Sequence, residues 1–488
     1  MRKHTPFFQA FGPLLFGRRA SSSAEFARRL DSLEELYAVF GDLLPETALK
    51  TTLQGPNSRQ RALPASVTFW AFVSQVLSPG SSCREVVRKV EAWWRWQHLR
   101  SCPGVSASAY CQARNRLDLE MLRLIRRHLS FQMERNVLES ERWLGGRAVK
   151  IVDGTMLSMP DTAGNQQLWP QSGEQKEGCG FPLMKLVALF SLSSGALLEE
   201  ATGNKHVHES RLFEQLWERL EKGDVLLEDR GFCSYGAMAA LFERGIDTVA
   251  RLHQARKVDM RQGKALGPGD RLVTWHKPAQ PPRDCDEEQW KALPASLCVR
   301  LIRLVVEAKG FRTRTALLAT TLADPVKYPA GEIRRLYGER WNVELHFAQL
   351  KTTLSLDILR CQSPEMIRKE LQIHLIAYNL VRSLMQRASH IHHQPLDRIS
   401  FKGSLDTVRH WAAVIHASAN QKRKQAELIN RMFALIAGDP VPERPKRSEP
   451  RAKKRRPKNY HLLTKPRNQM GNVPRRNRPH PNPKSALS

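Results

Sequence analysis

The sequence lacks the patterns that mark several large protein classes. Its eight cysteines are scattered without a CxxC pair, which excludes a zinc framework or a disulfide scaffold and is typical of reduced cytosolic thiols. It contains no stretch of 18 apolar residues, so a transmembrane helix is excluded. Residues 1–24 resemble a signal peptide, but Gln9 and Pro13 interrupt the apolar run and no strong cleavage site follows. We therefore expect a cytoplasmic protein with a basic N-terminal arm at 1–24.

Acidic residues are scarce relative to basic ones. The 488 residues include 77 Lys and Arg against 48 Asp and Glu, a formal net charge of +29 at pH 7. A charge of this size indicates a polyanionic partner, most often nucleic acid, although a generally basic surface without a ligand is the alternative. The length exceeds that of one hydrophobic core, so we expect two or three domains.

Residues 25–145 carry apolar residues at helical spacing, which predicts an all-helical N-terminal domain. Its last helical run sets Arg123, Arg126, Arg127 and Arg135 around an apolar stripe. These arginines predict either DNA binding through phosphate contacts or a solvated basic face, and the sequence favours neither.

Short β-rich runs alternate with helical runs across 146–252, which predicts an α/β fold with a mixed sheet and flanking helices. A hairpin that turns at Ser193-Ser194-Gly195 is expected within 183–203. Single strands are expected at 147–157, 224–232 and 246–252, and helices at 208–220 and 234–245.

The chain after residue 252 changes character twice. Residues 253–321 lose the helical pattern and predict a β-rich insertion, whereas 322–390 and a C-terminal segment at 391–439 are again helical. Residues 440–488 hold 10 prolines and 15 Lys or Arg against 2 Glu. Such a segment cannot bury a core, so we expect a disordered basic tail that binds phosphates or, alternatively, keeps the chain soluble.

The stretch YGERWNVELHFAQLK places polar residues on one edge of a predicted helix. A helix turns by about 100° per residue, so Tyr337, Arg340, Glu344 and Lys351 form a single stripe. The adjoining arc is apolar and is expected to be buried; it carries Leu336, Val343, Phe347, Leu350 and Leu354. The helix therefore presents a carboxylate flanked by two cations and a phenol.

Two further acids end predicted strands: Asp153 in VDGT and Asp229 in LLEDRGF. Open α/β sheets place their sites at the rim where strands end, although either acid alone could simply lead into a loop. Carboxylates that share a site with Glu344 would repel one another unless cations lay between them, and oxygen ligands suit Mg²⁺ or Mn²⁺. Two such ions bridged by a carboxylate form a phosphoryl-transfer centre. The neighbouring Arg340 and Lys351 are suited to phosphate oxygens.

Together, VDGT, EDRGF and Y-x2-R-x3-E-x6-K resemble the motifs of bacterial insertion-sequence transposases of the DDE type, in the insertion sequence 4 family with its Tyr-Arg-Glu-Lys signature. The four residues of the signature keep every spacing of the family pattern. The resemblance covers about 145–385 well, the basic tail loosely, and the N-terminal helices in general character only.

This resemblance implies a ribonuclease-H-like catalytic core in two parts, 146–252 and 322–390, with the β-rich insertion between them. It implies that Asp153, Asp229 and Glu344 are catalytic and bind two divalent metal ions, Mg²⁺ or Mn²⁺ as its substitute.

The resemblance also implies a set of DNA contacts. The signature residues Tyr337, Arg340 and Lys351 would contact phosphates near the transposon end, and Arg230 and Arg251 would be further contacts. The family uses an aromatic residue of the insertion to hold a flipped base. Trp275 or Trp290 could serve, although both are better explained as core tryptophans.

The expected reaction is cut-and-paste DNA transposition. A strand is hydrolysed at the end of the element, and the freed 3′-hydroxyl then attacks a target phosphodiester in line. The expected partners are double-stranded DNA (the terminal inverted repeats and the target) and a second copy of the chain in a synaptic homodimer. The expected location is the bacterial cytoplasm, in association with the nucleoid.

Three other functions compete with this one. A metal-dependent nuclease of the same fold would cleave without joining strands, and sequence cannot separate it from a transposase. A transposase-derived DNA-binding protein without catalysis is disfavoured because all three acids are present. An RNA-binding protein would explain the charge but not the acids.

Other polar residues near these motifs have weaker interpretations. His206 and His208 could ligate a metal with Glu209, but histidines two apart in a loop are more often surface residues. Glu228 precedes Asp229 in a strand, so its side chain is expected to point to the opposite face. Asp161 and Glu339 lie outside the motif positions.

Overall fold

The computed structural model describes residues 63–98, 105–253, 256, 258–281, 287–306, 314–417 and 421–442, with a few isolated residues of the tail. The N-terminal arm at 1–24 and most of the tail at 440–488 therefore lie outside the described residues. The N-terminal region is helical where it is described, as the apolar spacing predicts. Its helices are α5 (Ala65–Leu77), α6 (Cys83–His98), α7 (Ala107–Asn115) and α8 (Leu119–Arg135).

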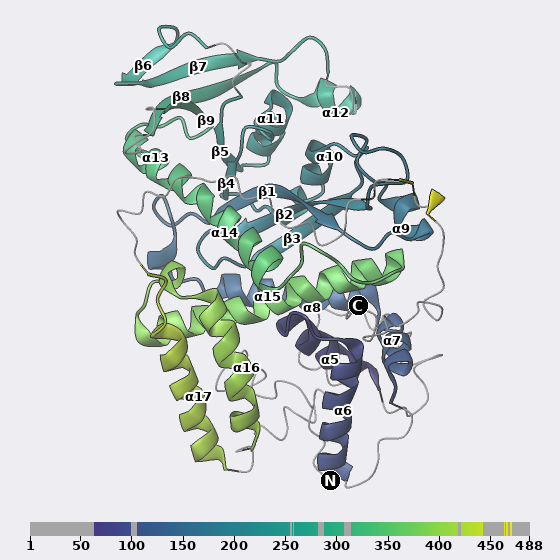
Figure 1. Ribbon diagram of the computed structural model, residues 1–488. Helices are drawn as coiled ribbons and strands as arrows, with labels where there is room; N and C mark the ends of the chain where they lie inside the picture. The colour runs from purple at the N-terminus through teal and green to yellow at the C-terminus, as the bar shows by residue number, and fades with distance from the viewer. Residues whose placement is uncertain are drawn as a thin grey trace, which may run out of the picture.

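A nine-stranded mixed sheet forms the centre of the molecule, in the order β3-β2-β1-β4-β5-β9-β8-β7-β6 (Figure 1). β1 pairs antiparallel with β2 and parallel with β4, and β4 pairs parallel with β5. The strands β2 and β3 form the predicted hairpin. The strand bounds in this part are β1 (Val149–Ser158), β2 (Leu183–Ser191), β3 (Leu197–Gly203), β4 (Val225–Glu228) and β5 (Asp247–Arg251).

The β-rich insertion is not separate from this sheet. Its last strand, β9, pairs antiparallel with β5, so the four insertion strands continue the central sheet at one edge. Where it is described, the insertion also contains a short helix, α12 (Glu287–Ala292), which the sequence pattern did not predict. Its strands are β6 (Lys264–Gly267), β7 (Asp270–His276), β8 (Ser296–Val306) and β9 (Arg314–Thr320).

Short helices connect the strands of the central part. The helix predicted at 208–220 is divided into α10 (Glu209–Glu214) and a 3₁₀ turn at Trp217–Arg219. The others are α9 (Ala163–Leu168) and α11 (Tyr235–Glu243), which follow β1 and β4 along the chain.

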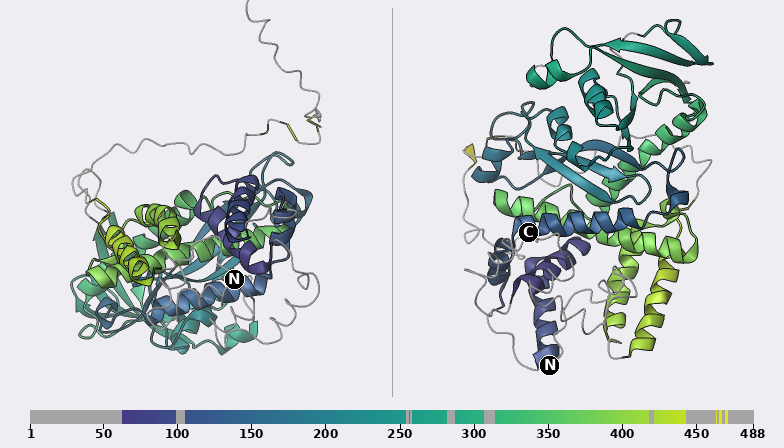
Figure 2. Two further views of the ribbon diagram at one scale, coloured as in Figure 1. Left: turned by 90° about the horizontal axis from the view of Figure 1, so that it is seen from below. Right: turned by 180° about the vertical axis from the view of Figure 1, so that it is seen from behind.

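The helical part after the insertion packs across the sheet and beneath it. α13 (Ala330–Gly338) and α14 (Asn342–Ala348) cross the strands in front in Figure 1, and α15 (Pro364–His392) lies side by side with α8 under β3 (Figures 1 and 2). α5, α6 and α7 on one side and α16 (Phe401–Ala417) and α17 (Lys422–Ala437) on the other extend from this helical layer, away from the sheet. None of the described helices is both long and apolar enough to cross a membrane.

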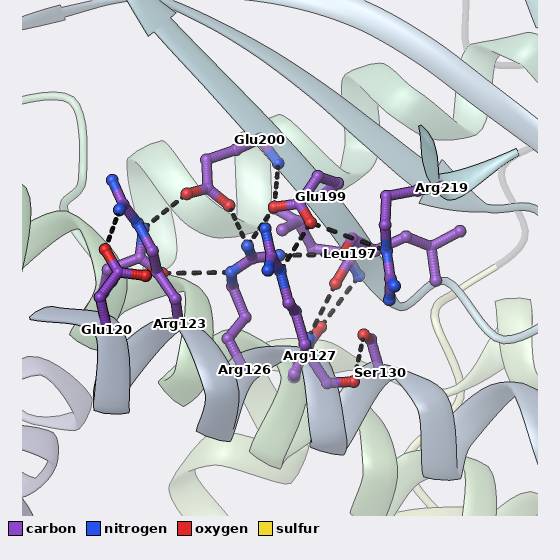
Figure 3. A network of polar contacts seen from close by, with 12 residues as sticks. Glu120, Arg123, Arg126, Arg127, Ser130, Leu197, Glu199, Glu200 and Arg219 are labelled. Carbon is purple, nitrogen blue, oxygen red and sulfur yellow. Dashed lines mark hydrogen bonds and ion pairs between the residues drawn. The ribbon is translucent and has the colours of Figure 1, made fainter. Parts of the chain in front are cut away.

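A buried ion network fastens α8 to β3 (Figure 3). Arg126 is fully buried; its Nη2 contacts both Glu199 Oε1 and, at 2.7 Å, Glu200 Oε2. Arg127, which is partly exposed, lies 2.9 Å from Glu199 Oε2. Arg126 therefore serves neither of the roles proposed for it from sequence, because its charge is neutralised inside the protein.

Candidate active site

Asp153 and Asp229 lie on neighbouring parallel strands, but only Asp229 follows the end of its strand. β1 and β4 pair from Val149–Val225 to Ile151–Leu227. The prediction that Asp153 ends its strand is wrong, because β1 continues to Ser158 and Asp153 is still paired with Ala188 of β2. β4 and β5 pair as far as Glu228–Ala250, so Asp229 and Arg251 directly follow this last pair. After burial, the charge of Asp229 contributes to the raised pKa of Asp153, and Asp229 and Arg251 both act on the pKa of Tyr337, so these side chains lie near one another where the β1–β4 pairing ends.

The third acid, Glu344, reaches this edge from a helix that is less regular than predicted. α13 passes into a 3₁₀ turn at Glu339–Trp341, then into α14, and then into a π-helical turn at Gln349–Thr353. The uniform 100° stripe is therefore only approximate. The predicted apolar face is nevertheless buried throughout: Leu336, Val343, Phe347, Leu350 and Leu354.

Arg340 joins two of the acids. Its Nη1 lies 3.8 Å from Asp153 Oδ2, and its Nη2 lies 3.7 Å from Glu344 Oε1. Arg340 and Asp153 are largely covered, whereas Glu344 is exposed. One guanidinium thus lies between acids from the sheet and from the helix, and it offsets the repulsion between them.

The pKa of Asp153 reflects the same crowding of acids. Burial raises the pKa of Asp153, and the charges of Asp229 and Glu344 raise it further, while the Gly154 amide and Arg340 oppose the shift. The Gly154 amide donates to Asp153 Oδ1 over 2.8 Å. These interactions show that the three acids lie within electrostatic reach of one another.

Tyr337 lies on the buried side of the same site. Burial raises its pKa to about 12, with Arg340 and Arg251 lowering it and Asp229 raising it. The phenol is therefore protonated at neutral pH and can donate a hydrogen bond.

The remaining predicted DNA contacts are placed differently from one another. Lys351 donates to Thr155 Oγ1 over 2.9 Å and to the Met156 carbonyl over 3.3 Å, so it braces β1 beside Asp153. Arg230 and Arg251 are exposed at the strand ends.

The tryptophans of the insertion are core residues, and a tryptophan elsewhere is exposed. Trp275 and Trp290 are both buried, and the Arg256 guanidinium lies 3.9 Å from the centre of the Trp275 ring. Trp341, which directly follows Arg340, is 53% exposed. No role was predicted for Trp341 from the sequence, although an aromatic residue between two signature positions of the polar stripe was a signal for one.

Within the described ranges, no group of three or more His, Cys, Asp or Glu side chains is close enough to hold a metal ion. Glu228, next to Asp229, is fully buried, and burial raises its pKa well above the usual value. It is therefore separate from the exposed edge, as the alternation along the strand predicts.

Comparisons with known proteins assign the chain to a family. The family described as "Transposase DDE domain" matches residues 144–380, and "Insertion element 4 transposase N-terminal" matches residues 31–126. The chain is similar to the transposase InsG for insertion sequence element IS4 of Escherichia coli K12, with 27% identity over 448 residues, 89% of this chain and 96% of that protein. It is also similar to the transposase for insertion sequence element IS421 of Escherichia coli, with 32% identity over 82 residues, 17% of this chain and 22% of that one.

A solved structure gives a weaker likeness. The piggyBac transposase synaptic complex with hairpin DNA covers 93% of this chain and 89% of its own, with 9% identity and a TM-score of 0.41. A TM-score of this size does not establish a shared fold. The sequence matches, by contrast, extend over both the helical N-terminal region and the part that carries the three acids. A DDE domain implies DNA binding and dependence on a divalent metal. The chain therefore belongs to the insertion sequence 4 family of DDE transposases, and it is an enzyme that cleaves DNA in transposition.

Proposed function

We propose that Asp153, Asp229 and Glu344 are the catalytic acids and that they hold two divalent ions, Mg²⁺ or Mn²⁺ as its substitute. With them the chain cleaves the ends of its element and joins the freed 3′-hydroxyl to target DNA. The observation that carries this proposal is the position of Arg340, whose guanidinium contacts both Asp153 and Glu344 at the edge where Asp229 follows β4.

The chemistry of these side chains fits divalent ions. All three offer carboxylate oxygens, the donors that Mg²⁺ and Mn²⁺ prefer. Burial, together with the charges of Asp229 and Glu344, raises the pKa of Asp153, so positive charge is favoured at this site. Among the described residues, Arg340 forms ion pairs with both Asp153 and Glu344. Held by these three carboxylates, two such ions would supply activation of the attacking oxygen and stabilisation of the leaving one.

The cations and the phenol around the acids are suited to the DNA backbone. Arg340 can exchange its carboxylates for phosphate oxygens, to which a guanidinium binds in a bidentate manner. Tyr337 donates from its protonated hydroxyl. Lys351 is hydrogen-bonded to Thr155 of β1, two residues after Asp153, and Arg230 and Arg251 add positive charge at the exposed strand ends. These residues hold the scissile phosphate in line with the acids.

The proposal extends to the domains of the chain and to its assembly on DNA. Residues 146–252 and 322–390 form a ribonuclease-H-like core, with 253–321 inserted and 391–439 as a C-terminal helical segment. The helical region 25–145 and the basic residues 440–488 bind DNA outside the active site. Two copies of the chain hold the two terminal inverted repeats in a homodimer, in the cytoplasm and at the nucleoid.

The test replaces each acid by its neutral amide: Asp153→Asn, Asp229→Asn and Glu344→Gln. Each should reduce cleavage of a duplex carrying an element end at least about 100-fold while DNA binding stays within about threefold. The matched control is Glu332→Gln on α13, a partly exposed glutamate whose ion pair among the described residues is with Arg335. Variants that cleave normally per bound molecule would refute the assignment.

A second assay separates the competing functions. Precut element ends mixed with supercoiled target DNA should yield joined products. A protein that cleaves ends but never joins precut ones would be a nuclease of the same fold. One that binds ends and does neither would be a DNA-binding derivative.

A further inference from the structure

Glu209, the first residue of α10, lies against the backbone of β1 next to Asp153. A methyl group added to Gly154 would lie 3.5 Å from both Cδ and Oε1 of Glu209 and 3.6 Å from its Oε2. All three atoms of the carboxylate are thus almost equally distant, so the group packs broadside against Gly154. Gly154 is the residue whose amide donates to Asp153 Oδ1.

The course of the strands explains how this approach is possible. β4 pairs with β1 only from Val149 to Ile151, so the β4 side of β1 is unpaired at Asp153 and Gly154. Successive residues of a strand face opposite sides of the sheet. Asp153 faces Arg340 on one side, and the side-chain position of Gly154 faces Glu209 on the other. Two carboxylates therefore flank one peptide group at the open end of the strand pair.

The charges at this edge leave Glu209 without a counterion. Arg340 is shared by Asp153 and Glu344. Glu209 is exposed, and among the described residues its side chain has neither a hydrogen bond nor an ion pair. An exposed carboxylate next to Asp153 increases the negative charge at this position, and that charge attracts a cation.

We propose that Glu209 is a fourth acid of the active site, which helps to hold a divalent cation beside Asp153 from the face of β1 opposite Glu344. The proposal rests on the catalytic role assigned above to Asp153. It also gives a physical reason for the glycine of VDGT, because a side chain larger than a methyl group at 154 would displace the Glu209 carboxylate. Of the cluster His206, His208 and Glu209, the glutamate is the member that reaches the site.

A structural role alone would leave a different signature. An acid in the first turn of a helix interacts favourably with the helix dipole. If that were the whole function of Glu209, its neutralisation would lower the melting temperature and leave metal affinity unchanged.

The first experiment measures Mn²⁺ binding to the full chain by titration calorimetry and by electron paramagnetic resonance, with and without duplex DNA from an element end. Glu209→Gln should weaken Mn²⁺ binding about tenfold. The control Glu218→Gln removes the same charge from an exposed residue of the neighbouring 3₁₀ turn and should change it less than twofold. Asp153→Asn serves as the reference, because the Mn²⁺ binding that this variant loses is the part that belongs to the proposed active site.

The outcomes distinguish the two proposals. Loss of Mn²⁺ binding in Asp153→Asn together with unchanged binding in Glu209→Gln overturns the inference about Glu209 and leaves the catalytic assignment intact. Unchanged binding in both variants refutes the catalytic assignment itself. A lower melting temperature with normal affinity in Glu209→Gln also overturns the inference.

A second variant tests the contact from the other side. Gly154→Ala is sterically allowed, because the added methyl meets Glu209 at ordinary van der Waals distance. It should weaken Mn²⁺ binding several-fold in the wild-type background and have no further effect in Glu209→Gln. Additive effects in this double-mutant cycle would show that the two residues act independently, against the inference.

Discussion

Replacing Arg126 with methionine should destabilise the protein severely. The guanidinium is fully buried and contacts two carboxylates, those of Glu199 and Glu200. It also donates from Nη1 to the Leu198 carbonyl over 2.9 Å and from Nε to Gln372 Oε1 over 3.1 Å. Methionine fills much of the same volume but supplies none of these donors.

The loss in the free energy of unfolding follows from the carboxylates that stay buried once Arg126 is removed. Removal of one partner of a buried ion pair costs about 3–5 kcal/mol, because the other charge stays buried without compensation. Whole domains are stable by only about 5–15 kcal/mol, so this loss is a large fraction of the total. Arg127 contacts the same Glu199 from a partly exposed position, and Arg127→Met should cost within about 1 kcal/mol.

The assay is urea unfolding of both variants beside the wild type, followed by tryptophan fluorescence. Arg126→Met combined with Glu199→Gln and Glu200→Gln should recover much of the loss, because the stranded charges are then absent. An Arg126→Met variant no less stable than Arg127→Met would refute the reasoning, since it would mean that the network is hydrated rather than buried.

Three further predictions concern other parts of the chain. Burial lowers the pKa of His128 to about 4, below its unfolded value of about 6.5, so its stabilising contribution is complete above pH 6.5 and is lost as pH falls towards 4. In urea unfolding, the difference in stability between wild type and His128→Gln should therefore shrink between pH 7.5 and pH 5. A constant difference would contradict this. The Cys83 and Cys111 sulfurs lie 3.9 Å apart, so hydrogen peroxide should oxidise the two thiols to a disulfide with loss of two hydrogens. Non-reducing peptide mass spectrometry should detect this disulfide in the wild type and not in Cys111→Ser. Two free thiols after treatment would contradict the prediction. Trp341→Ala should weaken DNA binding by about 1–3 kcal/mol with little change in melting temperature, because the ring is half exposed; unchanged affinity in a gel-shift titration would exclude a stacking role.

The parts of the fold that follow from local periodicity could be predicted from the sequence. The hairpin at 183–203 and the buried face of the helix that carries Glu344 depend on spacing within a short segment, and both are found. The end of β4 was also predictable, because its apolar run stops at Glu228 and Asp229. The end of β1 was predicted wrongly: Asp153 lies within the strand, which continues to Ser158 because β2 stays paired with it as far as Leu183.

The parts that depend on distant partners were not predictable in this way. The pairing of β9 with β5 joins segments more than 60 residues apart, and nothing in either segment specifies the other. The burial of Arg126 likewise requires Glu199 and Glu200 (Figure 3). Two successive acids in an apolar strand were a signal for such a partner. The approach of Glu209 to Gly154 depends on how α10 packs, which spacing alone does not determine.

The unbroken sheet limits how the enzyme can open and close around a substrate. Strand β9 pairs with β5 through its last three residues, Leu318 to Thr320, so backbone hydrogen bonds join strands β6 to β9 to the rest of the sheet. Bending there would break backbone hydrogen bonds, so these strands move only with the twist of the whole sheet. Arg251, at the end of β5, is itself paired with Leu318 of β9, so a shift of the outer strands would act directly on this residue. Adjustment to a bound substrate must come instead from the helices packed across the strands.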